Sequence, residues 1–165
     1  MNAEAPGARR MPPIQWQCSE LKALSAERLF AVCAAREAVF VVEQACAYQE
    51  LDGFDSHALH LIAWAGNAVA AYARILAPGT RFEAPSIGRV LTTKAFRRTG
   101  LGRTLMIKAL ERIDTLYPGH AVQISAQTYL QNFYAEFGFV SQAAPYLEDG
   151  LPHIEMRRPA AAGEL

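Results

Sequence analysis

The sequence predicts a mixed α/β (α+β) domain, and three observations support that class. The chain has 165 residues, of which 52% are hydrophobic, and this content suits one compact core. Segments with strand patterns and segments with helix patterns alternate along the chain. No break in composition and no internal repeat marks a second domain. We therefore expect a single domain over residues 14–158, with flexible tails over 1–13 and 159–165.

The first half of this domain predicts a strand, a helix and a hairpin. Residues 14–21, IQWQCSEL, predict the first strand. Ser25 suits a helix N-cap, and apolar residues at helical spacing extend that helix to about Val42. Residues 43–56 are a polar, turn-rich connection that is too long for a simple turn. Residues 57–78 then predict two strands, joined by an Ala-Gly-Asn-Ala turn that is typical of a hairpin.

The second half predicts a strand, a long helix and a closing group of short elements. Residues 85–96 contain a third sheet strand, and an amphipathic helix follows the glycines at 100 and 102 until Pro118 and Gly119 end it. The alternating segment AVQISAQ predicts another strand. LQNFYAEFG predicts a short helix that stops at Gly138. The last segment, to Arg158, predicts a strand pair around EDGLP.

Composition argues against several classes of protein. Basic and acidic residues number 16 each, so the net charge is formally zero, and we expect neither nucleic-acid nor membrane binding. No apolar run approaches the ~20 residues of a membrane span, and Arg9 and Arg10 lead into prolines, so no signal peptide is expected. The three cysteines form no CxxC pair and the four histidines lack ligand-spaced partners, which predicts no metal site. We expect a cytoplasmic protein.

The charge is nevertheless uneven. No acidic residue occurs between Glu83 and Glu111, whereas this window holds Arg89, Lys94, Arg97, Arg98, Arg103 and Lys108. A local basic patch in a neutral protein suits a small anion better than a long polyanion.

Within this window, the stretch RRTGLGR has two glycines between a strand and a helix. A Walker A loop is excluded because Arg97 stands where its first glycine must be and Arg103 replaces its lysine. A dinucleotide fingerprint is excluded because Leu105 stands at its third glycine. The pattern that remains, Arg97-x-x-Gly100-x-Gly102, suits a phosphate at a helix N-terminus, where free N–H groups and the helix dipole meet. A tight turn without a ligand is the alternative.

Two signatures together resemble a known superfamily. Arg97 to Gly102 resembles the Q/R-x-x-G-x-G/A loop of the GNAT superfamily of N-acetyltransferases. The segment FYAEFGF, with Tyr134 four residues before Gly138, resembles its second signature. Within the superfamily, the chain is similar to the ElaA-like branch in five segments, VFVVEQACAYQELDG, AYARIL, IGRV, LQNFY and EDGLPHIEM.

This resemblance covers most of the domain and implies both a fold and an activity. The implied fold has a central mixed, mostly antiparallel sheet flanked by helices. The implied activity moves an acetyl group from acetyl-coenzyme A, as a cosubstrate and without a metal, to a primary amine. The acceptor is either a small molecule or a protein amino group.

The resemblance also implies roles for particular residues. The strand edge at Val90, Leu91 and Thr92 would pair with the pantetheine, and a backbone N–H near Leu91 would face the oxyanion. The Tyr134 hydroxyl would protonate the departing thiolate, although packing in the core is the alternative role for this ring. The pyrophosphate would lie on the loop formed by Arg97, Arg98, Thr99, Gly100, Leu101, Gly102 and Arg103.

A polar side chain near the cofactor departs from the usual pattern. Many members carry Asn seven residues before the helix tyrosine, where this chain has Gln127, while an Asn occurs later at Asn132. Either residue could meet the cofactor. The substrate side offers Glu43, Asp52, Asp55, Glu148, Asp149 and His153 as candidates for a general base, beside a water chain with no dedicated base.

Two alternatives to the acetyltransferase stay open. Arg36, Arg74 and the carboxylates of ELDGFD resemble the pattern of acyl-homoserine lactone synthases, although we favour an ion-pair network that ties the first helix and its loop to the sheet. A sensor that binds acyl-coenzyme A without transfer is a non-enzymatic alternative, and Tyr134 argues against it. An exposed strand edge would also allow a homodimer.

Overall fold

The structure, a computed structural model, describes residues 11–160. Its described strands form one sheet in the order β1-β2-β3-β4-β5-β8-β6, with β7 paired to β8. The described strands and α-helices follow each other as β1 (Ile14–Glu20), α1 (Ala26–Glu37), β2 (Ala58–Ala65), β3 (Ala68–Leu76), β4 (Ser86–Thr92), α2 (Leu101–Leu116), β5 (Val122–Gln127), α3 (Gln131–Ala135), β6 (Val140–Ser141), β7 (Tyr146–Glu148) and β8 (Leu151–Arg158).

Every described strand pair is antiparallel except β4 with β5, which is parallel. The sequence-based prediction of a mixed, mostly antiparallel sheet is therefore confirmed. Of the expected tails over 1–13 and 159–165, residues 1–10 and 161–165 lie outside the described residues.

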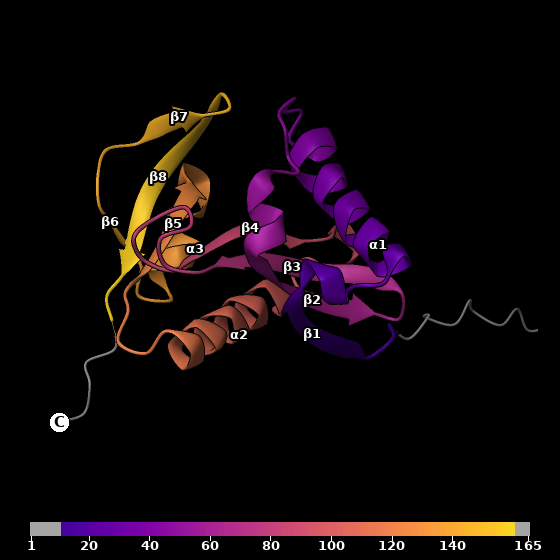
Figure 1. Cartoon of the computed structure of the whole chain (residues 1–165). Helices are drawn as coiled ribbons and strands as arrows, with labels where there is room; N and C mark the ends of the chain where they lie inside the picture. Colours follow the sequence, from indigo (N-terminus) through magenta and orange to yellow (C-terminus); the bar gives the residue numbers. More distant parts are fainter. Residues whose placement is uncertain (1–10, 161–165) are drawn as a thin grey trace, which may run out of the picture.

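The two long helices cover opposite faces of the sheet (Figure 1). Leu105, Met106 and Ile113 of α2 pack with alternate residues of β2, including Leu61, in one core cluster. Val32 of α1 belongs to a second cluster with residues of β2, β3 and β4. Because side chains alternate across a strand, the two helices pack against opposite faces of the same strands.

The first helix is capped as the sequence predicts, but its last part has a different geometry. The Ser25 hydroxyl accepts a hydrogen bond from the Arg28 amide at 3.3 Å. The α-helix ends at Glu37, and a π-helical turn continues over Ala38–Glu43. Apolar spacing over Val39–Val42 predicts helix but does not distinguish the two kinds of turn. Such π-turns occur frequently beside functional sites.

The polar connection after this helix is ordered by a short 3₁₀ turn over Gly53–His57. Asp52 caps it, since its carboxylate accepts from the Phe54 amide at 3.0 Å and the Asp55 carboxylate accepts from the Asp52 amide at 3.2 Å. The connection therefore has regular structure that its turn-rich composition does not predict.

The sheet opens between β4 and β5. The two strands pair at Ser86 with Gln123 and then diverge. The pairing of β3 with β4 shifts register between Tyr72 and Arg74, where Arg89 takes a left-handed conformation with φ of +52°. A bulge of this kind bends a strand and redirects its backbone groups. Beyond this opening lies the second part of the sheet, which consists of β5, β8, β6 and β7 (Figure 1).

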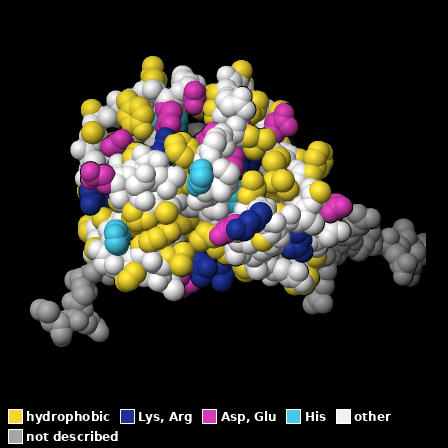
Figure 2. All heavy atoms as spheres, viewed as in Figure 1, with side chains coloured by type: hydrophobic (Ala, Val, Ile, Leu, Met, Phe, Trp, Pro, Cys, Tyr) yellow, Lys and Arg dark blue, Asp and Glu magenta, His cyan; other side chains and the backbone are white. Residues whose placement is uncertain are grey.

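On the face shown in Figure 2, acidic, basic and apolar side chains are interspersed, and no single charge covers it. This distribution agrees with the formal net charge of zero. Within residues 11–160, no helix is both long enough and apolar enough to cross a membrane.

Candidate active site

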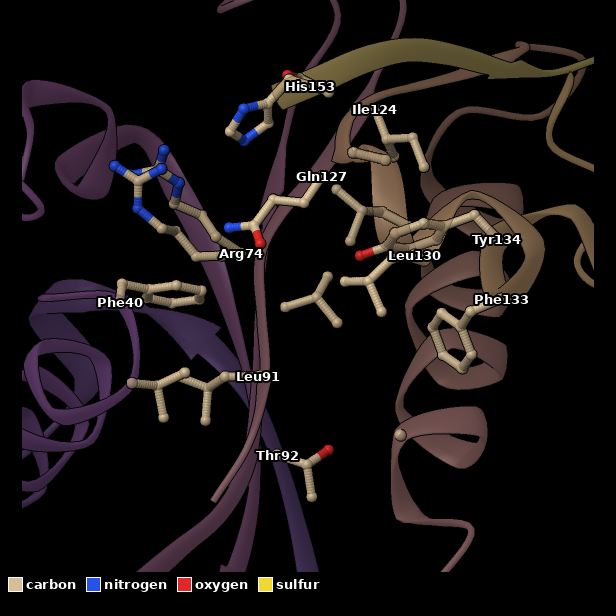
Figure 3. Close-up of a pocket in the computed structure, with 18 of the residues that line it drawn as sticks. Phe40, Arg74, Leu91, Thr92, Ile124, Gln127, Leu130, Phe133, Tyr134 and His153 are labelled. Atoms are coloured by element: carbon tan, nitrogen blue, oxygen red, sulfur yellow. The ribbon is translucent and has the colours of Figure 1, made fainter. Parts of the chain in front are cut away.

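A cavity of about 690 Å³ lies where β4 and β5 separate. Its wall is formed by both strands, the loop before α2, the π-helical turn, α3 and the β7–β8 hairpin. Figure 3 shows Phe40 and Leu91 on one side of this space and Tyr134 on the other, with Gln127 between them. The opening of the sheet therefore leaves a cleft between its two halves.

The structure brings most of the sequence-predicted residues together on this wall. They are Glu43, Val90, Leu91, Thr92, Arg97, Arg98, Gly100, Leu101, Gly102, Arg103, Gln127, Tyr134 and His153, together with Glu148 and Asp149. Four predicted residues do not line the cavity, namely Thr99, Asn132, Asp52 and Asp55. Within the described part of the chain, no group of His, Cys, Asp and Glu side chains is arranged to hold a metal ion.

The loop before α2 turns sharply into the helix. Arg98 and Gly100 both have left-handed backbone conformations, with φ of +63° and +84°. The amides of Arg103 and Thr104 donate to the Gly100 carbonyl oxygen at 3.1 and 3.2 Å, which begins the helix. The N–H groups ahead of them belong to the first turn, where a helix leaves its donors free and its dipole is positive. This end of the cavity therefore suits an anion.

Two arginine side chains of this loop already have carboxylate partners. Arg97 contacts Glu43 at 2.7 Å, and its Nε donates to the Thr92 carbonyl oxygen at 3.0 Å. Arg103 contacts Glu136, with a hydrogen bond of 3.0 Å. Both ion pairs are exposed, so each contributes little to stability and can exchange partners. A phosphate could therefore replace either carboxylate.

The ring of Tyr134 packs in the hydrophobic core, and its hydroxyl group lies at the wall of the cavity. Its ring meets Phe133 and Phe139 edge to face, with centroids 5.2 and 6.1 Å apart. The hydroxyl oxygen points into the space beside Gln127 (Figure 3). Burial raises the pKa of Tyr134 well above its usual value, so the phenol keeps its proton at neutral pH. The residue can therefore pack and donate a proton at once.

Gln127 and Asn132 lie in different places. Gln127 lines the cavity, and its amide nitrogen donates to the Gln44 side-chain oxygen at 3.0 Å. Asn132 is exposed on α3 and does not line the cavity.

A buried ion-pair network joins α1, the polar connection and the sheet, as we favoured from the sequence. Its members are three arginines and three carboxylates, namely Arg36, Arg74, Arg89, Glu50, Asp52 and Asp55. Arg36 is 1% exposed and contacts Glu50 at 2.9 Å and Asp55 at 2.7 Å. Arg74 is equally buried and contacts Asp52 at 2.6 Å and Asp55 at 3.0 Å. The network accounts for the positions of Asp52 and Asp55 away from the cavity.

Arg89 links this network to the cavity wall. Its Nε donates to a Glu50 carboxylate oxygen at 2.8 Å, and one terminal nitrogen donates to the Glu50 carbonyl oxygen at 3.0 Å. Arg89 is the left-handed residue of the β4 bulge, two positions before Leu91. The network therefore holds the part of β4 that lines the cavity.

A buried histidine completes this region. One ring nitrogen of His60 lies 2.9 Å from the Asp55 carbonyl oxygen, which can only accept, and the other lies 2.7 Å from the Tyr72 hydroxyl. Burial lowers the pKa of His60, so its ring is neutral at pH 7. Neutral His60 thus donates to Asp55 and accepts from Tyr72.

Five further polar side chains gather where the β7–β8 hairpin meets the cavity, and we name them the hairpin cluster. They are Arg81, Ser125, Tyr146, Glu148 and His153. Glu148 lies at the centre, because Arg81 contacts its carboxylate at 2.6 Å and the Ser125 hydroxyl donates to it at 2.7 Å. Burial alone would raise the pKa of Glu148, but the Ser125 hydrogen bond and the Arg81 charge lower it. Glu148 therefore stays ionised.

Sequence reasoning missed Arg81, Ser125 and Tyr146. Arg81 and Glu148 are 67 positions apart, and no local pattern connects them. Ser125 offered a weak signal, because it alternates with buried residues in the strand AVQISAQ and so faces the same side as Gln127.

Comparisons with known proteins agree with this arrangement. The family model described as "Acetyltransferase (GNAT) domain" matches residues 20–159. Protein ElaA of Escherichia coli is 43% identical over 147 residues, which cover 88% of this chain and 96% of that protein. Its crystal structure superposes with a TM-score of 0.83.

Two other solved structures are also similar. An acyl-CoA N-acyltransferase from Pseudomonas aeruginosa is 42% identical, with a TM-score of 0.84 over 88% of this chain and 99% of that one. The coenzyme A-dependent acyl-homoserine lactone synthase BjaI has a TM-score of 0.70 but is 16% identical over 88% of this chain and 84% of that one. At this low identity, the similarity to BjaI shows the fold alone.

Proposed function

The chain belongs to the acetyltransferase (GNAT) family, and from this premise we propose that it transfers the acetyl group of acetyl-coenzyme A to a primary amine. As a member of this family the chain is an acyltransferase. The observation that carries the proposal is the cavity between β4 and β5, because one cleft holds an anion-binding helix start, open strand backbone and the Tyr134 hydroxyl.

The dimensions and chemistry of the cleft suit an extended thioester. The pyrophosphate would lie on the loop amides between Arg98 and Arg103, where the first turn of α2 supplies N–H groups. The pantetheine would follow β4, whose edge is unpaired beyond Ser86. The Thr93 amide donates to the Ala70 carbonyl oxygen of β3 at 2.9 Å. Successive N–H groups of a strand point to opposite sides, so the N–H of Thr92 points away from β3 and into the cleft. Thr92 is therefore a donor for the pantetheine.

The thioester would then lie between β4 and Tyr134. As the amine nitrogen forms its bond to the carbonyl carbon, negative charge develops on the carbonyl oxygen. By the same alternation the Leu91 amide faces β3, so the neighbouring Val90 amide, which faces the cleft, would stabilise this charge. The C–S bond then breaks, and Tyr134 gives its hydroxyl proton to the departing thiolate. The proton released by the attacking nitrogen then reaches the Tyr134 phenolate through water and restores the phenol. Each of these steps uses a group that lines one cavity.

Either a small molecule or a protein amino group can serve as acceptor on this proposal. The acceptor would enter from the end that the hairpin cluster forms, because the loop before α2 occupies the opposite end. The ionised Glu148 would attract a cationic amine to this end.

A thiol-release screen tests the proposal. The protein is incubated with acetyl-coenzyme A and, in turn, amino acids, polyamines, aminoglycosides and peptides, and free thiol is followed with time. We expect steady thiol release that depends on at least one amine, with matching acetylation of that amine by mass spectrometry. Tight binding of acetyl-coenzyme A by calorimetry, with no amine-dependent release across the panel, would instead favour a sensor without transfer.

A further inference from the structure

The side chain of His153 has one fixed hydrogen bond and one free lone pair. Its Nδ1 lies 2.8 Å from the Leu151 carbonyl oxygen. A carbonyl oxygen only accepts hydrogen bonds, so Nδ1 carries the proton and, in the neutral ring, Nε2 carries the lone pair. The imidazole lines the cavity and extends from β8 toward the same space as Gln127 (Figure 3). The backbone thus selects the tautomer that can accept a proton from the cavity.

Glu148 is held beside that lone pair. The nearer carboxylate oxygen lies 3.9 Å from Nε2 of His153 and accepts from Ser125 at 2.7 Å. The Tyr146 hydroxyl, 2.5 Å from Ser125, and Arg81, 2.6 Å from the other carboxylate oxygen, complete the support. An anion at this distance stabilises an imidazolium more than a neutral ring. Glu148 is therefore fixed next to the ring nitrogen of His153 that carries the lone pair.

We propose that His153 is the general base that removes a proton from the acceptor ammonium, with Glu148 as its positioning residue. This inference rests on the proposed acyl transfer. Nε2 of His153 takes one proton from R–NH3⁺, which leaves R–NH2 to attack the thioester and makes an imidazolium beside Glu148. After the C–S bond breaks, the imidazolium returns this proton to water. The second nitrogen proton leaves by the route already given, so the protons balance.

The other acidic groups on the wall are already engaged or lie elsewhere. Glu43 is paired with Arg97 of the loop before α2. Asp149 is exposed in the hairpin turn, where its φ of +51° belongs to the reversal of the chain. The groups around His153 are Glu148 and Tyr146 from β7, the uncharged Ser125 and Gln127 from β5, and Arg81, which contacts Glu148. Arg74 of β3 and Arg89 of β4 also line this cavity, and both are paired with carboxylates of the buried ion-pair network. Unlike these groups, His153 has a ring nitrogen with a free lone pair that can accept a proton from the cavity.

The test compares the parent with His153→Gln across pH, using the amine that the thiol-release screen returns. Glutamine keeps hydrogen-bonding atoms but cannot accept a proton at neutral pH. We expect kcat/KM to fall on the order of 10²- to 10⁴-fold at pH 7, as is usual when a general base is lost. The deficit should shrink as the pH approaches the pKa of the amine, because the amine then arrives without its extra proton. Affinity for coenzyme A, measured by calorimetry, should stay unchanged.

Two further variants make the outcome unambiguous. His120→Gln changes an exposed histidine outside the cavity and should match the parent at every pH. Glu148→Gln should lower kcat/KM at pH 7 by less than His153→Gln does, and this deficit should also shrink toward the pKa of the amine, because the variant removes the anion beside the imidazolium. If His153→Gln is unstable, His153→Asn takes its place.

A His153 variant with full activity at pH 7, or with the same deficit at pH 7 and pH 10, would overturn the proposal. Failure of the parent to acetylate any amine would instead count against the proposed function itself. The two failures are therefore distinguishable.

Discussion

The Tyr134 hydroxyl shows how one residue can serve both the core and the chemistry. Its ring is locked between Phe133 and Phe139, which fixes the oxygen at the cavity wall. Burial raises its pKa, so the proton is present when the thiolate leaves. A raised pKa also makes this phenol a weaker acid in the ground state, so its assistance depends on the basicity of the developing thiolate.

Tyr134→Phe tests this role, because it keeps the ring and removes only the hydroxyl. We expect kcat to fall on the order of 10²-fold, the low end for general acids, because a thiolate is a fair leaving group unaided. The KM for acetyl-coenzyme A should change little, since the contribution arises mainly in the transition state. Steady-state rates at several pH values measure both constants. An undiminished kcat, where chemistry limits the rate, would leave Tyr134 with a packing role only.

At this scale, the sequence predicted the residues of the loop before α2 directly, and it missed several residues that meet only across the fold. Arg97, Gly100 and Gly102 form a short sequence pattern, and their residue types alone indicate a phosphate site at the start of a helix. Arg81 and Ser125 meet Glu148 only after the chain folds, so no spacing predicts their contact.

At the scale of elements, the loop before α2 depends on backbone conformation as much as on charge. Gly100 has φ of +84°, and a Cβ built there meets nothing within 4 Å, so the space beside it is open. A glycine in this conformation gives an anion room to approach the first helical amides.

Gly100→Val should therefore lower the affinity for coenzyme A at least 10-fold, because a branched side chain fills that approach; each factor of ten is about 1.4 kcal/mol. Valine also strains a left-handed position, so a matched variant is needed. Gly119→Val provides it, since Gly119 has φ of +75°, meets nothing within 4 Å and lies at the other end of α2. Calorimetry on both folded variants measures their affinity for coenzyme A. Equal affinity in the two variants would show that the loop does not bind the phosphates.

The buried ion-pair network acts between elements by joining α1 to the polar connection. Arg36→Ala would leave Glu50 and Asp55 without one cation, although Arg89 and Arg74 still contact them. We expect a loss of about 3 kcal/mol in the free energy of unfolding, the low end for breaking a buried pair. Urea denaturation measures it, with the exposed Arg157→Ala as the control. Unchanged stability with a raised acceptor KM would mean that Arg36 holds substrate instead.

The sequence predicted where most elements begin and end, because caps and glycines mark them. Ser25 and Gly138 behave as expected from their residue types. The π-turn over Ala38–Glu43 was not predicted, because apolar spacing does not distinguish it from an α-helix. The 3₁₀ turn over Gly53–His57 was not predicted either, because a turn-rich composition does not specify the kind of turn.

At the scale of the whole molecule, stability should depend on pH through two buried groups. The pKa of His60 is lowered by burial, so below about pH 6.5 the unfolded chain binds this proton more readily than the folded chain. Burial alone would raise the pKa of Asp55, but Arg36 and Arg74 lower it, so its stabilising effect is lost below about pH 4.

Urea denaturation across pH 3–8 should therefore show a free energy of unfolding that falls from about pH 6.5 downward and falls further below about pH 4. One proton can contribute at most about 1.4 kcal/mol per pH unit. His60→Gln should flatten the slope between pH 5 and 6.5 and leave the acidic fall in place. The same slope in this variant and the parent would show that His60 does not cause it.

The order of the strands in the sheet could not be predicted from local sequence patterns. Alternation predicts each strand, but the single pairing of Ser86 with Gln123, and the opening beyond it, depend on how the two halves of the sheet pack. The resemblance to the GNAT superfamily supplied the expected fold where periodicity did not. A homodimer stays a prediction at this scale, and β1 lies at one edge of the sheet, where a second strand could pair.

The central claim is that the thioester lies in the opening between β4 and β5, between a β4 amide and Tyr134. A crystal structure with a thioether analogue of acetyl-coenzyme A tests it most directly. We predict pantetheine alongside β4, its acyl oxygen within hydrogen-bonding distance of an amide of residues 90–92, and its sulfur beside the Tyr134 hydroxyl. Binding of the analogue elsewhere, or with its sulfur remote from Tyr134, would contradict the account.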